Sequence, residues 1–140
     1  MLSKGFFRQW AVLLTALFLF ISCERIKPLE PEELVKLYYE QVLTFSTGME
    51  GCVELVKKYG FYSKAGQKVR HTKDTARSAC EKAQKDRTAR WSYTVEKRYR
   101  NEELGRANYI LRLMVDGRIP YERDVAFEKV GGIWRFYISP

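Results

Sequence analysis

The residues best suited to covalent chemistry in this sequence are three cysteines, Cys23, Cys52 and Cys80, and a single histidine, His71. A nucleophilic cysteine needs an adjacent base, and a protein metal site needs clustered ligands at short spacing. The sequence contains no Cys-x-x-Cys pair and no second histidine. It therefore predicts no cysteine catalysis, no metal site and no bound cofactor.

The first cysteine follows a short apolar segment. Lys4 and Arg8 make the start of the chain positive, and residues 10–21 read WAVLLTALFLFI. A membrane-spanning helix needs about 20 apolar residues, so this run has the length of a signal-peptide core instead. The four residues FISC at 20–23 resemble the lipobox of bacterial lipoproteins, with Phe where Leu is usual. That resemblance implies cleavage before Cys23, a lipid on its sulfur, and acylation, for example by palmitate, of the new amino terminus.

The resulting organisation has three parts. Residues 1–22 are the expected signal peptide, residues 23–30 the lipidated cysteine with a polar tether, and residues 31–140 one domain of ordinary size. Glu24 follows the cysteine. By resemblance to enteric lipoprotein sorting, this favours anchoring in the cell envelope at the periplasmic face of the outer membrane.

Export would leave Cys52 and Cys80 as an even pair of thiols in an oxidising compartment. Cys52 recurs with Leu55 and Val56 at helical spacing, and Cys80 shares its expected helix face with small alanines. A face of small side chains allows a second helix to come close. The sequence therefore predicts a disulfide that joins two helices.

Helical patterns occupy the first half of the domain and strand patterns the second. We expect helices at 31–47, 50–59 and 72–85, with a polar, basic loop at 63–71. Alternating apolar residues predict four strands, and Asp116-Gly117 and Gly131-Gly132 predict tight turns between the last three. An antiparallel meander after a group of helices indicates an α+β fold. The expected strands are 90–100, 107–115, 119–129 and 133–138.

This element order resembles the nuclear-transport-factor-2-like superfamily, and within it the small bacterial lipoproteins of unknown function. The segment PEELVKLYY at 31–39 resembles their first helix, and FEKVGGIWRF at 127–136 resembles their last hairpin. The resemblance implies a cone, with N-terminal helices packed in the concave face of a curved antiparallel sheet. The basic, cysteine-bearing helix at 72–85 departs from that pattern.

A cone of this kind can contain a pocket. Proton-transfer enzymes of the superfamily place a carboxylate base and a tyrosine or acid donor there. Here the candidate carboxylates, Glu96 and Asp124, point away from the apolar faces in the expected register. The sequence thus favours a non-enzymatic domain that binds a partner protein or a small apolar ligand, with a proton-transfer enzyme as the alternative. The candidate pocket residues are Tyr38, Phe45, Trp91, Tyr93, Tyr109, Tyr121 and Trp134.

Positive charge is unevenly distributed along the chain, whose net charge is +8. Most of the excess falls between Lys57 and Arg100. Such a block attracts phosphate groups, although a solvated helix face is the simpler interpretation. In an envelope location, the phosphates of anionic lipid or glycolipid are more accessible than nucleic acid, which we do not expect as a partner. The candidate patch comprises Lys57, Lys58, Lys64, Lys68, Arg70, Lys73 and Arg77.

Overall fold

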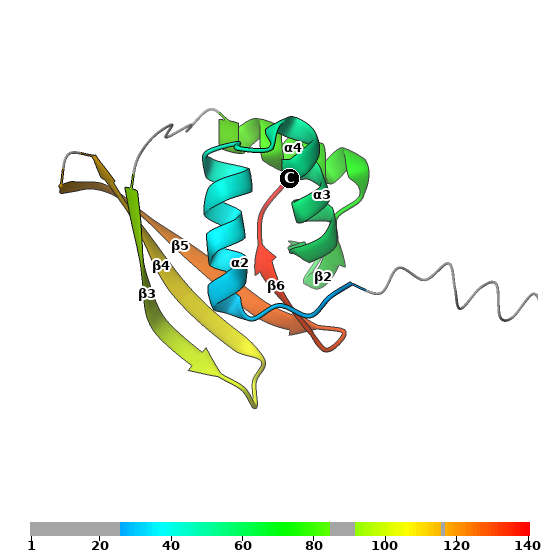
Figure 1. Cartoon of the computed structure of the whole chain (residues 1–140). Coiled ribbons are helices and arrows are strands. Elements are labelled where there is room, and N and C mark those ends of the chain that lie inside the picture. Colours follow the sequence, from blue (N-terminus) through cyan, green and yellow to red (C-terminus); the bar gives the residue numbers. More distant parts are fainter. Residues whose placement is uncertain (1–25, 85–91, 116) are drawn as a thin grey trace, which may run out of the picture.

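Helices and strands separate into two layers in the computed structural model of the chain, which describes residues 26–84, 92–115 and 117–140. Three α-helices lie on the same side of a curved sheet (Figure 1). They are α2 (Pro31–Leu37), α3 (Gly48–Tyr59) and α4 (Lys73–Gln84). This arrangement confirms the predicted α+β fold. The expected signal peptide, Cys23 and Trp91 lie outside the described residues, and no described helix is long and apolar enough to cross a bilayer.

The described sheet has six strands in the order β2-β1-β6-β5-β4-β3. The last four strands form the predicted antiparallel meander. Strand β1 instead runs parallel to β6. The sheet is therefore mixed, whereas the sequence predicted a purely antiparallel one. The strands are β1 (Gly60–Lys64), β2 (Gln67–Arg70), β3 (Ser92–Asn101), β4 (Arg106–Val115), β5 (Arg118–Val130) and β6 (Ile133–Tyr137).

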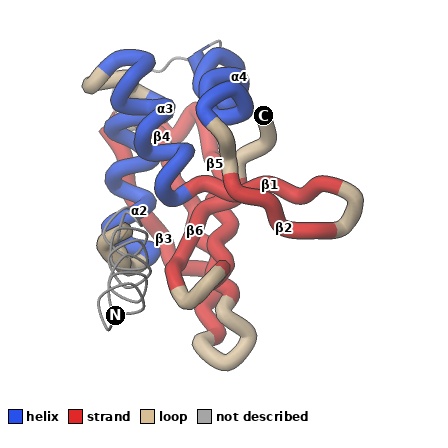
Figure 2. The backbone as a smooth tube through the Cα atoms, turned by 90° about the vertical axis from the view of Figure 1, so that its right-hand side faces the viewer, coloured by secondary structure: helices blue, strands red, loops and turns tan. Residues whose placement is uncertain are grey.

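The predicted loop at 63–71 is wrong, because most of it belongs to the β1–β2 hairpin, which projects beside the helical layer (Figure 2). Ala65 and Gly66 both have positive φ angles, of 51° and 78°, as a two-residue hairpin turn with matching strand twist requires. The outer half of this hairpin is polar and exposed on both faces. It therefore lacks the apolar alternation by which a strand is recognised in sequence.

The first helix is also shorter than predicted. Regular α-helix ends at Leu37, and a π-helical segment, η1 (Tyr38–Leu43), follows. The hydroxyls of Thr44 and Ser46 both donate to the carbonyl of Glu40, each at 2.7 Å. Hydroxyl groups that bond to backbone carbonyls in this way compete with the regular helical pattern. The chain then turns and starts α3 at Gly48, where sequence had indicated only a stop.

The core lies between the two layers. Alternate residues of β4 are buried, as the strand pattern predicted, and Phe127 and Phe136 continue the same apolar surface across the sheet. Cys52 and Cys80 are fully buried and form the predicted disulfide between α3 and α4, with their Cα atoms 6.1 Å apart. The small face of α4 makes this approach possible; its buried alanines are Ala76, Ala79 and Ala83.

Candidate anion-binding site

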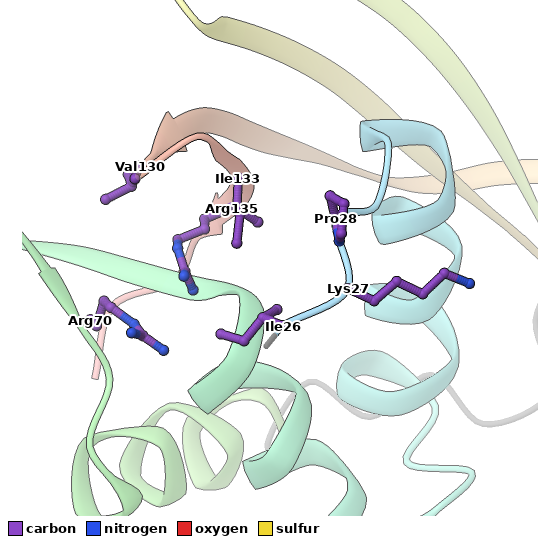
Figure 3. Close-up of a pocket in the computed structure, with 8 residues that line it drawn as sticks. Ile26, Lys27, Pro28, Arg70, Val130, Ile133 and Arg135 are labelled. Atoms are coloured by element: carbon purple, nitrogen blue, oxygen red, sulfur yellow. The ribbon is translucent and has the colours of Figure 1, made fainter. Parts of the chain in front are cut away.

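A hollow of about 610 Å³ opens where the tether, the β1–β2 hairpin and the β5–β6 turn meet (Figure 3). Three different parts of the chain build it, and two arginines enter it from different strands. The described residues that line it include no carboxylate and no histidine. They are Ile26, Lys27, Pro28, Arg70, Val130, Gly131, Ile133 and Arg135.

Arg135 is the central polar residue of this hollow. It lies on β6, which is enclosed by β1 on one side and β5 on the other, and only 3% of it is exposed. Its Nη1 donates to the backbone carbonyl of Lys58 in the last turn of α3. A cation is favourably placed at that end of a helix, where unsatisfied carbonyls give a partial negative charge. The backbone of α3 therefore fixes the position of the guanidinium.

Arg135 has no carboxylate partner within the described part of the chain. No described acid lies within ion-pair distance of it, and its buried Nε makes no hydrogen bond there. Burial lowers the pKa of Arg135 below the usual arginine value, and the nearby positive charge of Arg70 lowers it further. Because a buried cation is costly without a counter-charge, this side chain is suited to an anion supplied from outside.

Arg70 supplies the second positive charge. It ends strand β2, is exposed, and extends toward Arg135 across the hollow, whereas the Lys27 side chain points away (Figure 3). Guanidinium groups present planar arrays of donors that match phosphate and carboxylate oxygens. Two of them converging on one space form a binding geometry for a small anion.

The tether forms the opposite, apolar wall. The hydroxyl of Tyr59 donates to the carbonyl of Lys27 at 2.6 Å, and Ile26 packs against the core. These contacts hold the tether against the domain. Val130 and Ile133 add further apolar surface at the β5–β6 turn. The hollow therefore combines a cationic end with an apolar wall, which is the chemistry of a site for an amphiphilic anion.

The aromatic residues proposed from sequence as a pocket lie elsewhere. Tyr38, Tyr109 and Trp134 are buried in the core, and Phe45, Tyr93 and Tyr121 pack against it with part of their surface exposed. Tyr38 packs edge-on against Phe136 with ring centroids 5.3 Å apart. The structure thus brings most of this set into one apolar core.

The candidate carboxylates are on the surface. Glu96 is exposed and pairs with Arg112, and Asp124 is exposed. The acid that does meet a tyrosine is Glu32, which accepts a 2.5 Å hydrogen bond from Tyr109. Burial, reinforced by this bond and by the charge of Glu32, raises the pKa of Tyr109 to about 12. Burial alone would raise the pKa of Glu32, but Tyr109 and nearby positive charges lower it, so the carboxyl stays ionised.

The basic residues proposed as a patch are all exposed. They lie on the last turn of α3, the β1–β2 hairpin and the first half of α4. Only Arg70 among them lines the hollow, and Lys68 pairs with Glu128 at 2.6 Å. Sequence reasoning missed Arg135 altogether. The sequence carried no clear signal for it, because the expected alternation puts Trp134 and Phe136 on one face of the strand and leaves Arg135 on the other.

Comparisons with known proteins place few constraints on this chain. No family model matches it, and no curated protein matches it. It is similar to a solved structure named Rd1NTF2_05, in a form with five substitutions, at 14% sequence identity and a TM-score of 0.41. The similarity covers 79% of this chain and 98% of the other.

Proposed function

We propose that the protein is a non-enzymatic envelope lipoprotein whose domain binds a small anionic ligand with an apolar portion. The observation that carries this proposal is Arg135, a buried arginine that lacks a described counter-charge and lines an open hollow. Arg70 and the apolar tether complete the recognition surface.

Binding fits the site better than catalysis. The described lining of the hollow offers positive charge and apolar surface, but no group with which to accept a proton near neutral pH. The carboxylates considered for proton transfer, Glu96 and Asp124, are exposed. These features support a role in holding a ligand.

The location belongs to the same proposal. A lipid on Cys23 would anchor the domain in the envelope, at the periplasmic face of the outer membrane in a host that has one. Metabolic labelling with an acyl analogue tests the anchor. Wild type should be labelled and membrane-bound, and Cys23→Ser should be neither; equal labelling of both would reject the lipidation site.

Thermal unfolding tests the binding. Inorganic phosphate should raise the unfolding midpoint of the wild-type chain at constant ionic strength, since a ligand that binds only the folded state stabilises it. Arg70→Gln should remove most of that rise. Arg77→Gln, an exposed arginine of α4 outside the lining of the hollow, is the matched control. Equal rises in all three proteins would show that phosphate acts elsewhere.

A further inference from the structure

We infer that the anion held by Arg70 and Arg135 is the headgroup phosphate of an anionic phospholipid in the membrane that carries the lipid anchor. This inference rests on the proposed function and names its ligand class. It follows from where the hollow lies along the chain, from the chemistry of its two ends and from the charges around it.

The position of the hollow is set by the tether. Ile26 forms part of its wall and lies only three positions after Cys23 in the sequence. Three residues of fully extended chain span at most about 10 Å. A lipid on Cys23 would therefore confine the backbone of this wall to within about 10 Å of the backbone of the anchored cysteine, at the depth of the phospholipid headgroups.

The chemistry of the hollow matches that location. Two guanidinium groups suit the oxygens of one phosphate. Ile26, Pro28, Val130 and Ile133 suit the glycerol carbons and first methylenes that follow a headgroup phosphate. A free inorganic phosphate would satisfy the arginines but leave this apolar wall in contact with water.

Surrounding charge favours the same membrane. Lys57 and Lys58 are exposed at the end of α3, next to the carbonyl that binds Arg135. Basic residues near a bilayer are attracted to anionic lipids. They would bring the hollow toward anionic headgroups before the two arginines engage one of them.

Native mass spectrometry of the full acylated protein in detergent provides the test. The protein is titrated with phosphatidylglycerol, with phosphatidylcholine of matched acyl chains, and separately with inorganic phosphate. We expect one phosphatidylglycerol per protein, bound at least tenfold more tightly than phosphatidylcholine. Arg70→Gln and Arg135→Gln should each weaken phosphatidylglycerol at least tenfold, whereas Arg77→Gln should not.

Each other outcome has a definite meaning. Arginine-dependent binding of inorganic phosphate without a preference for phosphatidylglycerol overturns the lipid inference and leaves the proposed function intact. No arginine-dependent binding of any of the three probes overturns both. Equal weakening by Arg70→Gln and Arg77→Gln would indicate diffuse charge attraction and also overturn the inference. If Arg135→Gln fails to fold, the exposed Arg70 decides the question.

Discussion

Two regions of the sheet, the Arg100 side on β3 and the Arg135 side on β6, differ in how the charge of each arginine is satisfied. Arg100, on β3, contacts Glu30 at 2.6 Å, Glu102 at 2.5 Å and Glu32 at 3.4 Å. The hydrogen bonds with Glu30 and Glu102 raise the pKa of Arg100 above the usual arginine value. Arg135 has one described hydrogen bond, to a carbonyl, and burial lowers its pKa.

The difference separates a structural arginine from one available to a ligand. Glu30 and Glu32 lie at the start of α2, so Arg100 attaches that helix to the edge of the sheet, where it also lies over the ring of Trp134 at 5.5 Å. The chain itself therefore supplies the carboxylates that balance the charge of Arg100. On the Arg135 side the described lining of the hollow includes arginines and no carboxylate, which is why we assign the ligand to that side.

The largest expected change in stability comes from removing the disulfide that supports the Arg135 side. The disulfide holds α3, whose last turn positions the guanidinium. Replacing both cysteines by alanine should lower the free energy of unfolding by about 3–4 kcal/mol on the chain-entropy model for a loop of this length. Urea unfolding of the double variant and of wild type measures the loss.

Hydrogen exchange on the same two proteins gives the location. Faster exchange should appear first in α3 and α4, because the disulfide joins these helices directly, and the antiparallel strands β4 and β5 should stay protected. Uniform acceleration throughout the domain would show that the disulfide does not support this side in particular.

The arginines themselves provide the second comparison. Arg100→Met should cost about 1 kcal/mol, the upper range for a partly exposed ion-pair network. Without ligand, Arg135→Met should change stability by less than that, since the lost hydrogen bond is offset by removal of a buried, unpaired charge. Urea unfolding at low phosphate distinguishes them. A larger loss for Arg135→Met would mean that this arginine is mainly structural.

The smallest expected effect distinguishes the two sides by pH. His71 lies on the Arg135 side, buried, with Nε2 donating to the Ile138 carbonyl at 2.8 Å. Burial lowers the pKa of His71 below its ordinary 6.5. The contribution of neutral His71 to the free energy of unfolding is therefore complete above about pH 6.5, and it is lost as the pH falls toward the folded-state pKa.

Glu32, on the Arg100 side, has a pKa lowered from 4.5. The contribution of its ionised form to the free energy of unfolding is therefore kept above about pH 4.5 and lost only below that pH. Between pH 7 and 5 the unfolding free energy should decline slightly in wild type. The decline should be absent in His71→Gln, and an identical decline in that variant would rule out this histidine as the source.

The sequence predicts the parts of the fold that depend on local pattern. Alternating apolar residues placed β4 correctly, and the alanine face of α4 together with the cysteine count gave the disulfide. The β1–β2 hairpin escaped prediction because its polar outer residues pair only with each other among the described strands, while Gly60 and Phe61 at its start pair with β6, a distant segment. The π-helical segment depends on hydroxyl groups that bond to Glu40 instead of capping a helix.

The candidate site could be predicted only in part from the sequence, because it too depends on contacts between distant segments. Arg70 could be recognised as part of a basic block, but its meaning depends on Arg135, which is distant in sequence and lies across the hollow. The lack of a counter-charge is a property of three-dimensional neighbours. The spacing of residues along the sequence therefore cannot predict that Arg135 lacks a counter-charge.

The parallel pairing of β1 with β6 has a consequence for the order of folding. Outside the hairpin itself, the described strand that pairs with β1 is β6, the last one. His71 and Ile138, which form a hydrogen bond across this junction, are 67 residues apart. Contacts this distant in sequence form late, since a long loop must close before they contribute. The helical layer can therefore complete its attachment to the sheet only after β6 has been synthesised.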